Sequence, residues 1–368
     1  MLRYGSPSRP PLTRRALSVA VIAPPYLPVP PPGYGGIERV VSALVDGLAR
    51  RGHQVTLVAA PGSTAPAKVV TPLATAPILG DPAAVTDELC HALALYRRAG
   101  DFDVIHDHTN LGAMIGAVAG GGAAVVHTLH GPWTAAARRM LSLLDDRVAL
   151  VAISHAQRAA NSDVSYAGVV HNGVDMDLHP LRTVKEDFLI FVGRTSPEKR
   201  PEVAIAVARR AGLPLKMVVK RTEPGEARYW DEAVSPLLGS DIEVLDQPPQ
   251  DVKVDLMGRA RALVFPIAWP EPFGLVMTES MACGTPVIAR PLGAAPEVVI
   301  DGVTGFLCTT EGQMVAAVEA ARSIDPETCR RVTGDRFSTD AMTRGYERVY
   351  HSLVGAGSER SRPLSAGN

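Results

Sequence analysis

Strand-like and helical segments alternate along almost the whole chain, and this alternation most constrains what the chain can fold into. Strands that alternate with helices form mainly parallel sheets, so we expect an α/β protein. In the first half, the predicted strands are 17–23, 53–60, 103–108, 123–130, 149–154 and 168–174. In the second half, they are 188–193, 215–220, 242–246, 262–267 and 286–289.

The 368 residues are enough for two domains of ordinary size. The segment 179–188, "HPLRTVKEDF", lacks apolar periodicity and is the predicted linker. We expect an N-terminal domain over 16–180, a C-terminal domain over 181–337, and disordered tails at 1–15 and 355–368. Ligands of open α/β sheets bind beyond the carboxyl ends of the strands, so two such sheets predict a binding cleft between the domains.

Charge and cysteine content exclude several functional classes. The chain has 37 Lys+Arg against 38 Asp+Glu, a balance that gives no reason to expect nucleic-acid binding or strong membrane attraction. The four cysteines have neither zinc-site nor disulfide-framework spacing. A basic start followed by the apolar run 16–23 imitates a signal peptide, but the run is short and ends in prolines. We therefore expect a cytoplasmic protein with free thiols.

The stretch "PPPGYGGIERV", Pro30–Val40, is either a disordered proline-rich segment or a glycine loop that opens a helix. Apolar residues recur after it at helical spacing, and Gly52 stands where a glycine would end the helix. The stretch is therefore a strand-to-helix loop. Gly35 and Gly36 lie at the predicted helix N-terminus, where free N–H groups favour an anion. A plain turn that requires glycine remains an equally good interpretation of this loop alone.

Six histidines lie at or near predicted strand ends: His106, His108, His127, His130, His155 and His171. His106 and His108 alternate and should share one face of a strand. They lack a third convincing ligand, so a metal site is not favoured. Hydrogen bonding to sugar or phosphate is one alternative, and capping of elements is another. "SHAQ", Ser154–Gln157, fits a capping box, for which a structural role is favoured.

In the second half, "GRTSPEKRP" places Arg194 and Lys199 in a loop just past a buried strand. An arginine fork and a lysine point charge could hold a pyrophosphate there. The alternative is two solvated surface cations.

"WPEPFGLVMTESMACGTPVIA" is the most informative stretch, because Glu271 and Glu279 form an E-x7-E pattern. Glu279 falls in an apolar helix that begins near Gly274, so its carboxylate requires hydrogen-bond donors. Sugar or ribose hydroxyls would serve as donors, and N–H groups at the helix start could meet phosphate or hydroxyl oxygens. The alternative is a salt bridge to an arginine such as Arg290.

Over about 16–353, the chain resembles the retaining nucleotide-sugar glycosyltransferases of family 4. These have the GT-B fold, with two Rossmann-like domains facing each other across a cleft. The motifs that carry the resemblance occur in the family's order, and the ordered set is specific. They are "GYGGIERV", "DVIHDH", "TLHG", "HNGVD", "GRTSPEK", "EPFGLVMTES", "GTPVIA" and "GAAPEVVIDGVTGFL".

The resemblance implies a role for each matching position. Gly35 and Gly36 would approach donor phosphates or sugar, Arg194 and Lys199 would hold the diphosphate, and Glu279 would bind the ribose. Catalytic roles are expected for His130, Arg194, Lys199 and Glu271. The backbone of Phe273, Gly274 and Leu275 would complete the donor site, with Lys220 as a further candidate. His106 and His108 are the acceptor-side candidates. A C-terminal helix at about 338–354 would cross back to the N-terminal domain.

The resemblance also implies transfer from a UDP- or GDP-sugar to an acceptor hydroxyl, with retention and without a metal or cofactor. "DMD", Asp175–Asp177, is expected to be a turn. Lys220 departs from the family, which often has glycine there, and this leaves the donor's identity open. A nucleotide-sugar epimerase and a non-catalytic sugar-binding protein are the alternatives.

Overall fold

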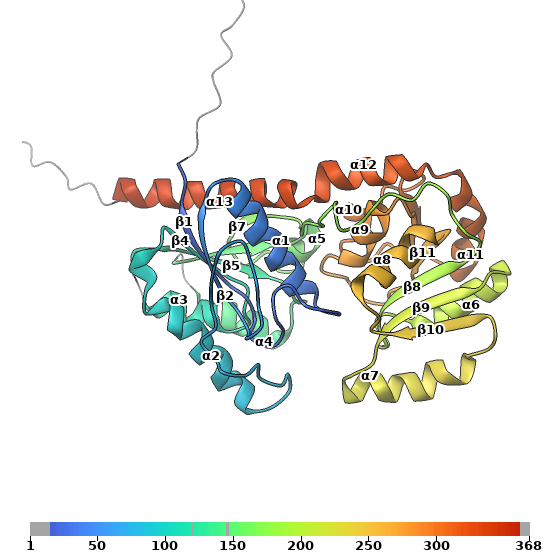
Figure 1. Ribbon diagram of the computed structural model, residues 1–368, viewed down its shortest axis with the longest axis horizontal. Coiled ribbons are helices and arrows are strands. Elements are labelled where there is room, and N and C mark those ends of the chain that lie inside the picture. The colour runs from blue at the N-terminus through green and yellow to red at the C-terminus, as the bar shows by residue number, and fades with distance from the viewer. Residues whose placement is uncertain (1–14, 120, 145–146, 361–368) are drawn as a thin grey trace, which may run out of the picture.

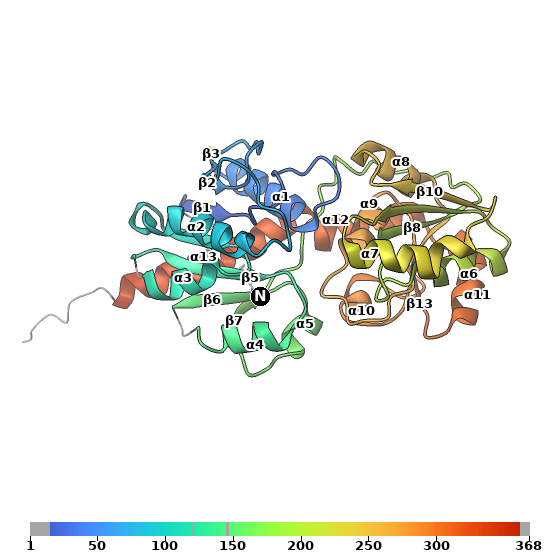
Figure 2. The same ribbon diagram turned by 90° about the horizontal axis from the view of Figure 1, so that it is seen from below.

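The computed structural model describes residues 15–119, 121–144 and 147–360, which form two domains lying side by side (Figures 1 and 2). Each domain contains one parallel sheet with helices on its faces, which confirms the predicted α/β class. Of the tails predicted at 1–15 and 355–368, residues 1–14 and 361–368 lie outside the described residues. No helix in the described part of the chain is long and apolar enough to span a bilayer.

The N-terminal domain has a seven-stranded sheet in the order β3-β2-β1-β4-β5-β6-β7. Its strands are β1 Ser18–Ile22, β2 Gln54–Val58, β3 Lys68–Val70, β4 Val104–Asp107, β5 Ala124–Leu129, β6 Val148–Ala152 and β7 Tyr166–Val169. Its helices are α1 Gly36–Arg50, α2 Ala83–Tyr96, α3 Gly112–Ala119, α4 Ala135–Leu141 and α5 His155–Ala159, with a 3-10 turn at Ala99–Asp101. The order places β1 and β4 at the centre, so α1 follows a central strand.

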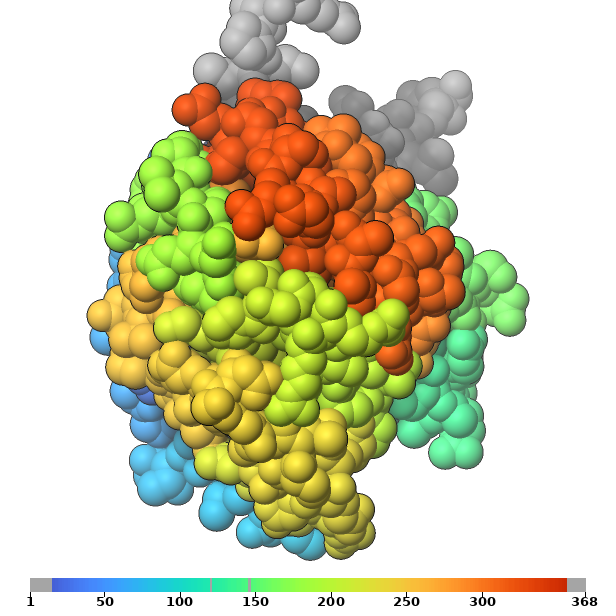
Figure 3. All heavy atoms as spheres, turned by 90° about the vertical axis from the view of Figure 1, so that its right-hand side faces the viewer, coloured from blue at the N-terminus to red at the C-terminus, as the bar shows by residue number. Residues whose placement is uncertain are grey.

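The C-terminal domain has a six-stranded sheet in the order β10-β9-β8-β11-β12-β13. Its strands are β8 Leu189–Arg194, β9 Leu215–Lys220, β10 Ile242–Asp246, β11 Ala262–Phe265, β12 Val287–Ala289 and β13 Gly305–Leu307. Its α-helices are α6 Pro201–Ala211, α7 Pro224–Tyr229, α8 Gln250–Arg259, α9 Leu275–Ala282, α10 Ala295–Val298, α11 Glu311–Ala320 and α12 Pro326–Phe337. A π-helical turn at Trp230–Val234 follows α7, and 3-10 turns lie at Ser235–Leu237 and Ala321–Ser323. Figure 3 shows the molecule from the side of the C-terminal domain, whose segments, coloured from yellow-green to red, pack together into a continuous surface.

Every predicted strand is present, and two short strands, β3 and β13, were not predicted. Each has 3 residues, too few for a period-two pattern to stand out. The strand predicted at 168–174 is instead β7 at Tyr166–Val169. The chain has left the sheet by Val174, which forms a bridge with Ser338.

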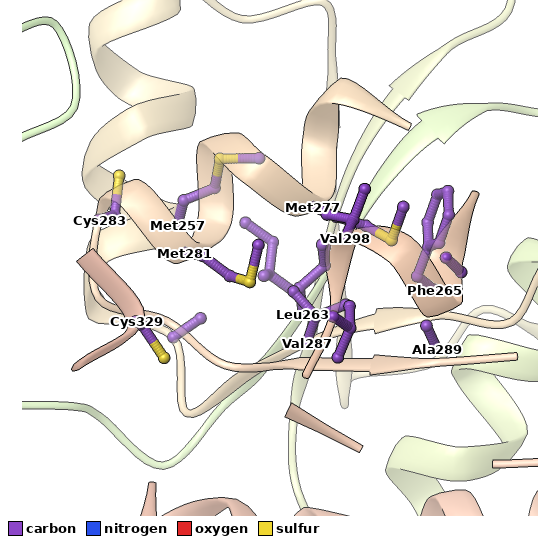
Figure 4. Packing of buried hydrophobic residues seen from close by; sticks show 14 of the residues in the cluster. Met257, Leu263, Phe265, Met277, Met281, Cys283, Val287, Ala289, Val298 and Cys329 are labelled. Atoms are coloured by element: carbon purple, nitrogen blue, oxygen red, sulfur yellow. The ribbon is translucent and has the colours of Figure 1, made fainter. Parts of the chain in front are cut away.

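Apolar clusters cover both faces of each sheet. In the C-terminal domain, Met277 and Met281 of α9 pack with residues of β11 and β12 (Figure 4). Leu263 and Val287 are fully buried there. This packing explains the apolar character of α9 and fixes the helix that carries Glu279.

The chain crosses between the domains twice. The first crossing contains the predicted linker, and residues 179–188 form neither helix nor strand. The second lies at Ser338, where α12 ends and α13, Thr339–Arg360, begins. Figure 1 shows α13 along the N-terminal domain, where Tyr346 and Tyr350 are fully buried. The helix continues beyond the end predicted at residue 354, into part of the predicted tail.

Candidate active site

A cavity of about 440 Å³ lies between the domains and is lined by residues of both. The predicted site residues that line it are Gly35, Gly36, His130, Arg194, Lys199, Lys220, Glu271, Phe273, Gly274, Leu275 and Glu279. They come from the start of α1 and the residue before it, from the loop after β5, from the carboxyl ends of β8 and β9, from the loop after β8, and from α9 and the loop before it. The fold thus brings together residues far apart in the sequence at one cleft.

The glycine loop is held in place by contacts that leave no room for a larger residue. A Cβ atom at Gly35 would lie 2.7 Å from Cγ of Pro31. The Arg39 guanidinium donates to the Gly33 carbonyl at 2.6 Å, and this hydrogen bond attaches the loop to α1. Gly35 provides no side-chain cap for α1, and the buried Glu38 carboxylate in the first turn accepts from its own backbone N–H. A Cβ at Gly36 would lie 3.4 Å from Leu275 of the opposite domain.

Arg194 and Lys220 end two neighbouring strands and lie opposite each other in the register of β8 and β9. Nη2 of Arg194 lies 3.0 Å from a Glu198 carboxylate oxygen. Nζ of Lys220 lies 2.7 Å from Glu223 and 3.1 Å from Glu226. These cations are therefore held by carboxylates at the cleft wall, rather than extended into solvent.

Tyr34 of the glycine loop reaches across to the C-terminal domain. Nζ of Lys220 lies 5.3 Å from the centroid of the Tyr34 ring, a cation–π contact between domains. Desolvation by the cleft walls raises the pKa of the Tyr34 hydroxyl to about 12, although 46% of the residue is exposed, and the Arg194 charge acts in the opposite direction. Tyr34 is therefore neutral at pH 7 and serves as a hydrogen-bonding and stacking group.

Lys199 and Glu271 form an ion pair inside the cavity wall. The Lys199 ammonium also lies 5.4 Å from the Phe265 ring centroid and 5.2 Å from that of Trp269. Nε1 of Trp269 donates to the same Glu271 oxygen at 2.9 Å. Gly293, at φ 57°, packs against the backbone of Glu271, and a Cβ there would lie 2.3 Å from the Glu271 nitrogen. The Glu271 loop is thus fixed on both sides.

Glu279 is 7% exposed on α9, and both of its carboxylate oxygens lie 3.0 Å from Nζ of Lys253 on α8. The salt bridge considered from the sequence exists, but its partner is Lys253 rather than Arg290. Burial acts to raise the pKa of Glu279, but the charges of Lys253, His179 and Arg39 outweigh it and lower the pKa. Glu279 therefore remains an ionised hydrogen-bond acceptor at the cavity.

His130 lines the cavity, and its Nε2 lies 2.8 Å from Nδ1 of His108. Burial, together with the charge of His127, lowers the pKa of His130 to about 3, so the imidazole is neutral at pH 7. His108 is not among the cavity-lining residues and stands behind His130.

His106 is also absent from the cavity lining. Its two ring nitrogens are engaged by the Tyr350 hydroxyl at 2.6 Å and Thr128 Oγ1 at 2.7 Å. The predicted acceptor-side pair therefore lies behind the cleft, because the side chain of His106 is turned toward α13.

The remaining histidines of the predicted cluster lie at the domain boundary or in the core. Glu297 of α10 accepts from the backbone N–H groups of His155 at 2.8 Å and Ala156 at 2.6 Å. It also lies 3.1 Å from Nε2 of His171. Among the described residues, His155, His171 and Glu297 form the one cluster whose geometry suits a metal ion, and none of them lines the cavity between the domains.

Two local predictions, a helix cap at Ser154 and a turn at Asp175–Asp177, concern residues near this boundary. Oγ of Ser154 accepts from the Gln157 N–H at 2.9 Å, as a cap would. The Gln157 side chain accepts from the Ile153 N–H instead of Ser154, so the capping box is only half formed. In "DMD", the Asp177 N–H donates to Asp175 Oδ1 at 2.9 Å, which confirms the turn.

Sequence reasoning missed several cavity residues. Arg39 lies in the first turn of α1, and a cation three residues after Gly36 was the available signal. Lys253 could be inferred only as the donor that buried Glu279 requires. Gln250 and Asn172 carried no signal, because single amides in loops and helix starts are common.

Comparisons with known proteins agree with this architecture. Residues 34–178 match the family model described as Glycosyltransferase Family 4. Residues 179–332 match the model described as Glycosyl transferases group 1. D-inositol 3-phosphate glycosyltransferase of Mycobacterium sp. (strain KMS) is 29% identical over 394 aligned positions, which cover 89% of this chain and 88% of that protein.

Solved structures with the same fold cover nearly the whole chain. AviGT4, a glycosyltransferase involved in avilamycin A biosynthesis, has a TM-score of 0.72 and 27% identity, covering 92% of this chain and 98% of its own. HepE of Anabaena, in complex with UDP and glucose, has a TM-score of 0.70 and 21% identity, covering 92% and 100%. Sucrose-phosphate synthase from Thermosynechococcus elongatus has a TM-score of 0.74 and 21% identity, covering 93% and 100%.

Proposed function

We propose that this chain, which is a glycosyltransferase of the GT-B type, transfers a sugar from a nucleoside-diphosphate sugar to an acceptor hydroxyl with retention of anomeric configuration. The observation that carries the proposal is the convergence on one cavity of Arg194, Lys199 and the N-terminus of α1, whose N-cap residue Gly35 has no side chain. Cations and a helix N-terminus favour phosphate, and the cavity also contains a buried carboxylate suited to ribose hydroxyls, Glu279.

The similarity to known proteins also supports a nucleotide-sugar donor. HepE, which shares the fold, is described in complexes with UDP and with UDP-glucose. The named relatives are glycosyltransferases, which does not favour the epimerase or the non-catalytic alternative. A nucleotide-sugar donor also fits the cytoplasmic location expected from the sequence.

The proposed chemistry follows from where negative charge develops. Cleavage of the bond between the sugar and the diphosphate produces an oxocarbenium-like sugar and a nucleoside diphosphate. Arg194, Lys199 and the N–H groups of α1 would stabilise the departing diphosphate without a metal or cofactor. Their present partners, among them Glu198 and Glu271, hold the cations in position before the donor arrives.

Attack from the same face as the leaving group gives retention and requires no protein nucleophile. A donor phosphate oxygen would take the proton of the acceptor hydroxyl as the new glycosidic bond forms. His130 is neutral, so it would orient sugar or acceptor hydroxyls by hydrogen bonding rather than as a cation. Closure of the domains over the cavity would expel water before bond cleavage.

The test is a transfer assay with purified protein, nucleotide sugars and candidate acceptors, with and without EDTA. We expect nucleoside diphosphate release that depends on donor and survives EDTA. NMR of the anomeric proton in the product should show the configuration of the donor. Inverted product would overturn retention, complete loss with EDTA would overturn metal independence, and sugar isomerisation without acceptor would favour the epimerase.

A further inference from the structure

Gln250 is the first residue of α8, and its side-chain nitrogen Nε2 is buried without a hydrogen-bond partner in the described part of the chain. Gln250 also lines the cavity between the domains. A buried amide N–H without an acceptor is unfavourable, and a ligand that accepts from it removes that cost. The amide therefore points to a ligand atom with a lone pair.

The position of Gln250 relative to Lys253 identifies which part of a donor it would meet. The two residues are one helical turn apart on α8 and so lie on the same face. Lys253 binds Glu279, the carboxylate assigned above to the ribose. A group attached to that ribose and lying toward the start of α8 reaches the Gln250 amide. In a nucleoside this group is the base.

The surroundings of Gln250 fit a flat aromatic ring. Near the ends of β8, β9 and β10, the cavity lining includes the apolar side chains of Val192, Val218, Val219 and Pro248, with Arg194, Lys220 and Gln247 beside them. The apolar side chains can contact the faces of a ring but cannot distinguish one base from another, and Arg194 and Lys220 are already paired with carboxylates. The amide of Gln250 can make that distinction at the ring's edge.

We infer that Gln250 reads the base of the donor, with its buried amide N–H donating to a keto oxygen on the ring. Uracil carries this oxygen at C4 and guanine at C6, whereas cytosine and adenine carry an amino group there. The donor is then a uridine or guanosine diphosphate sugar. The inference rests on the proposed function, since it takes the cavity to be the donor site.

Matched nucleotide pairs test it, with binding measured by isothermal titration calorimetry. UDP and CDP differ at C4 and in the proton on N3, and GDP and ADP differ at C6, in the proton on N1 and in the 2-amino group of guanine. We expect the wild-type protein to bind the keto member of its preferred pair at least about tenfold more tightly, because the amino group leaves the amide N–H without an acceptor. Gln250→Leu should bring both members to within about threefold of each other. Gln250→Glu, which can only accept, should favour the amino member.

Gln54→Leu, an exposed change on β2 far from the cavity, is the matched control and should keep the wild-type preference. Circular dichroism of each variant reports folding. Equal binding of UDP and CDP and of GDP and ADP by the wild type overturns the inference, as does an unchanged preference in folded Gln250→Leu. In either case nucleotide binding itself still supports the proposed function. If none of the four nucleotides binds, the proposed function and the inference both fail.

Discussion

Lys253 lies with its ammonium 3.0 Å from each carboxylate oxygen of Glu279, so that two buried, opposite charges from neighbouring helices form a bidentate pair at the edge of the cavity. Neither charge would be stable there alone. The pair keeps a negatively charged acceptor ionised in a site where the donor's ribose is proposed to bind.

Replacing Lys253 should mainly lower the stability of the protein, whereas replacing Glu279 should mainly lower its affinity for a nucleoside diphosphate. Lys253→Met leaves Glu279 as an unpaired buried charge, and we expect the free energy of unfolding to fall by about 3 kcal/mol. Glu279→Gln keeps the shape but weakens the acceptor, so nucleoside diphosphate affinity should fall about tenfold or more. Urea unfolding and calorimetry measure the two effects. Glu243→Gln, an exposed glutamate on β10, is the control. Unchanged affinity in Glu279→Gln would remove its ribose role.

Arg194→Ala and Lys199→Ala should each lower the turnover number by about 100-fold or more, because each removes positive charge from the site of the developing diphosphate. Turnover should fall more than donor affinity, since the charge is largest in the transition state. Lys216→Ala is a charge-matched control whose side chain pairs with Glu243, outside the cavity lining. Steady-state kinetics with a saturating acceptor provide both values. Wild-type turnover in both cleft variants would show that the diphosphate assignment is wrong.

Acid should destabilise the N-terminal domain through its buried imidazoles. Burial lowers the pKa values of His106, His108, His127 and His130 below the ordinary value of 6.5. The unfolded chain therefore binds more protons than the folded chain below pH 6.5, and stability must fall as the pH falls. Each imidazole contributes roughly 1 kcal/mol per pH unit in this range. Urea unfolding at pH 7.5, 6.5 and 5.5 measures how the free energy of unfolding changes with pH. A free energy that does not change would contradict the interpretation that these imidazoles are buried in their neutral form.

Glu297→Gln should loosen the contact between the domains. The carboxylate accepts from His155 and Ala156 of one domain while belonging to the other. Burial opposes ionisation, but His171 and the two N–H donors outweigh it and lower the pKa of Glu297. Its stabilisation is therefore present above the ordinary carboxyl pKa and is lost as the pH falls through the lowered value. We expect a loss of about 1 kcal/mol at pH 7 that disappears in acid. Thermal unfolding of both proteins at pH 7 and at a series of lower pH values down to pH 3 makes the comparison, because the loss occurs only as the pH falls through the lowered pKa.

The sequence was sufficient for most of the elements and for the cleft, because β/α alternation and glycine loops are local patterns. It predicted that Glu279 needs a donor but not that Lys253 supplies it. That pairing, between residues 26 apart, depends on how α8 sits against α9. Likewise, the spacing of His106 and His108 does not reveal that α13 returns to cover them with Tyr350. Contacts set by tertiary packing were the ones that sequence patterns could not supply.

The bridge between Val174 and Ser338 joins the two places where the chain passes from one domain to the other. The Val174 N–H donates to the Phe337 carbonyl at 2.7 Å, and the Thr339 N–H donates to the Val174 carbonyl at 3.1 Å. Two strands of backbone tied at one point act as a single pivot. A swing of the lobes about this pivot would turn α12 against α13 and would move the glycine loop relative to Leu275.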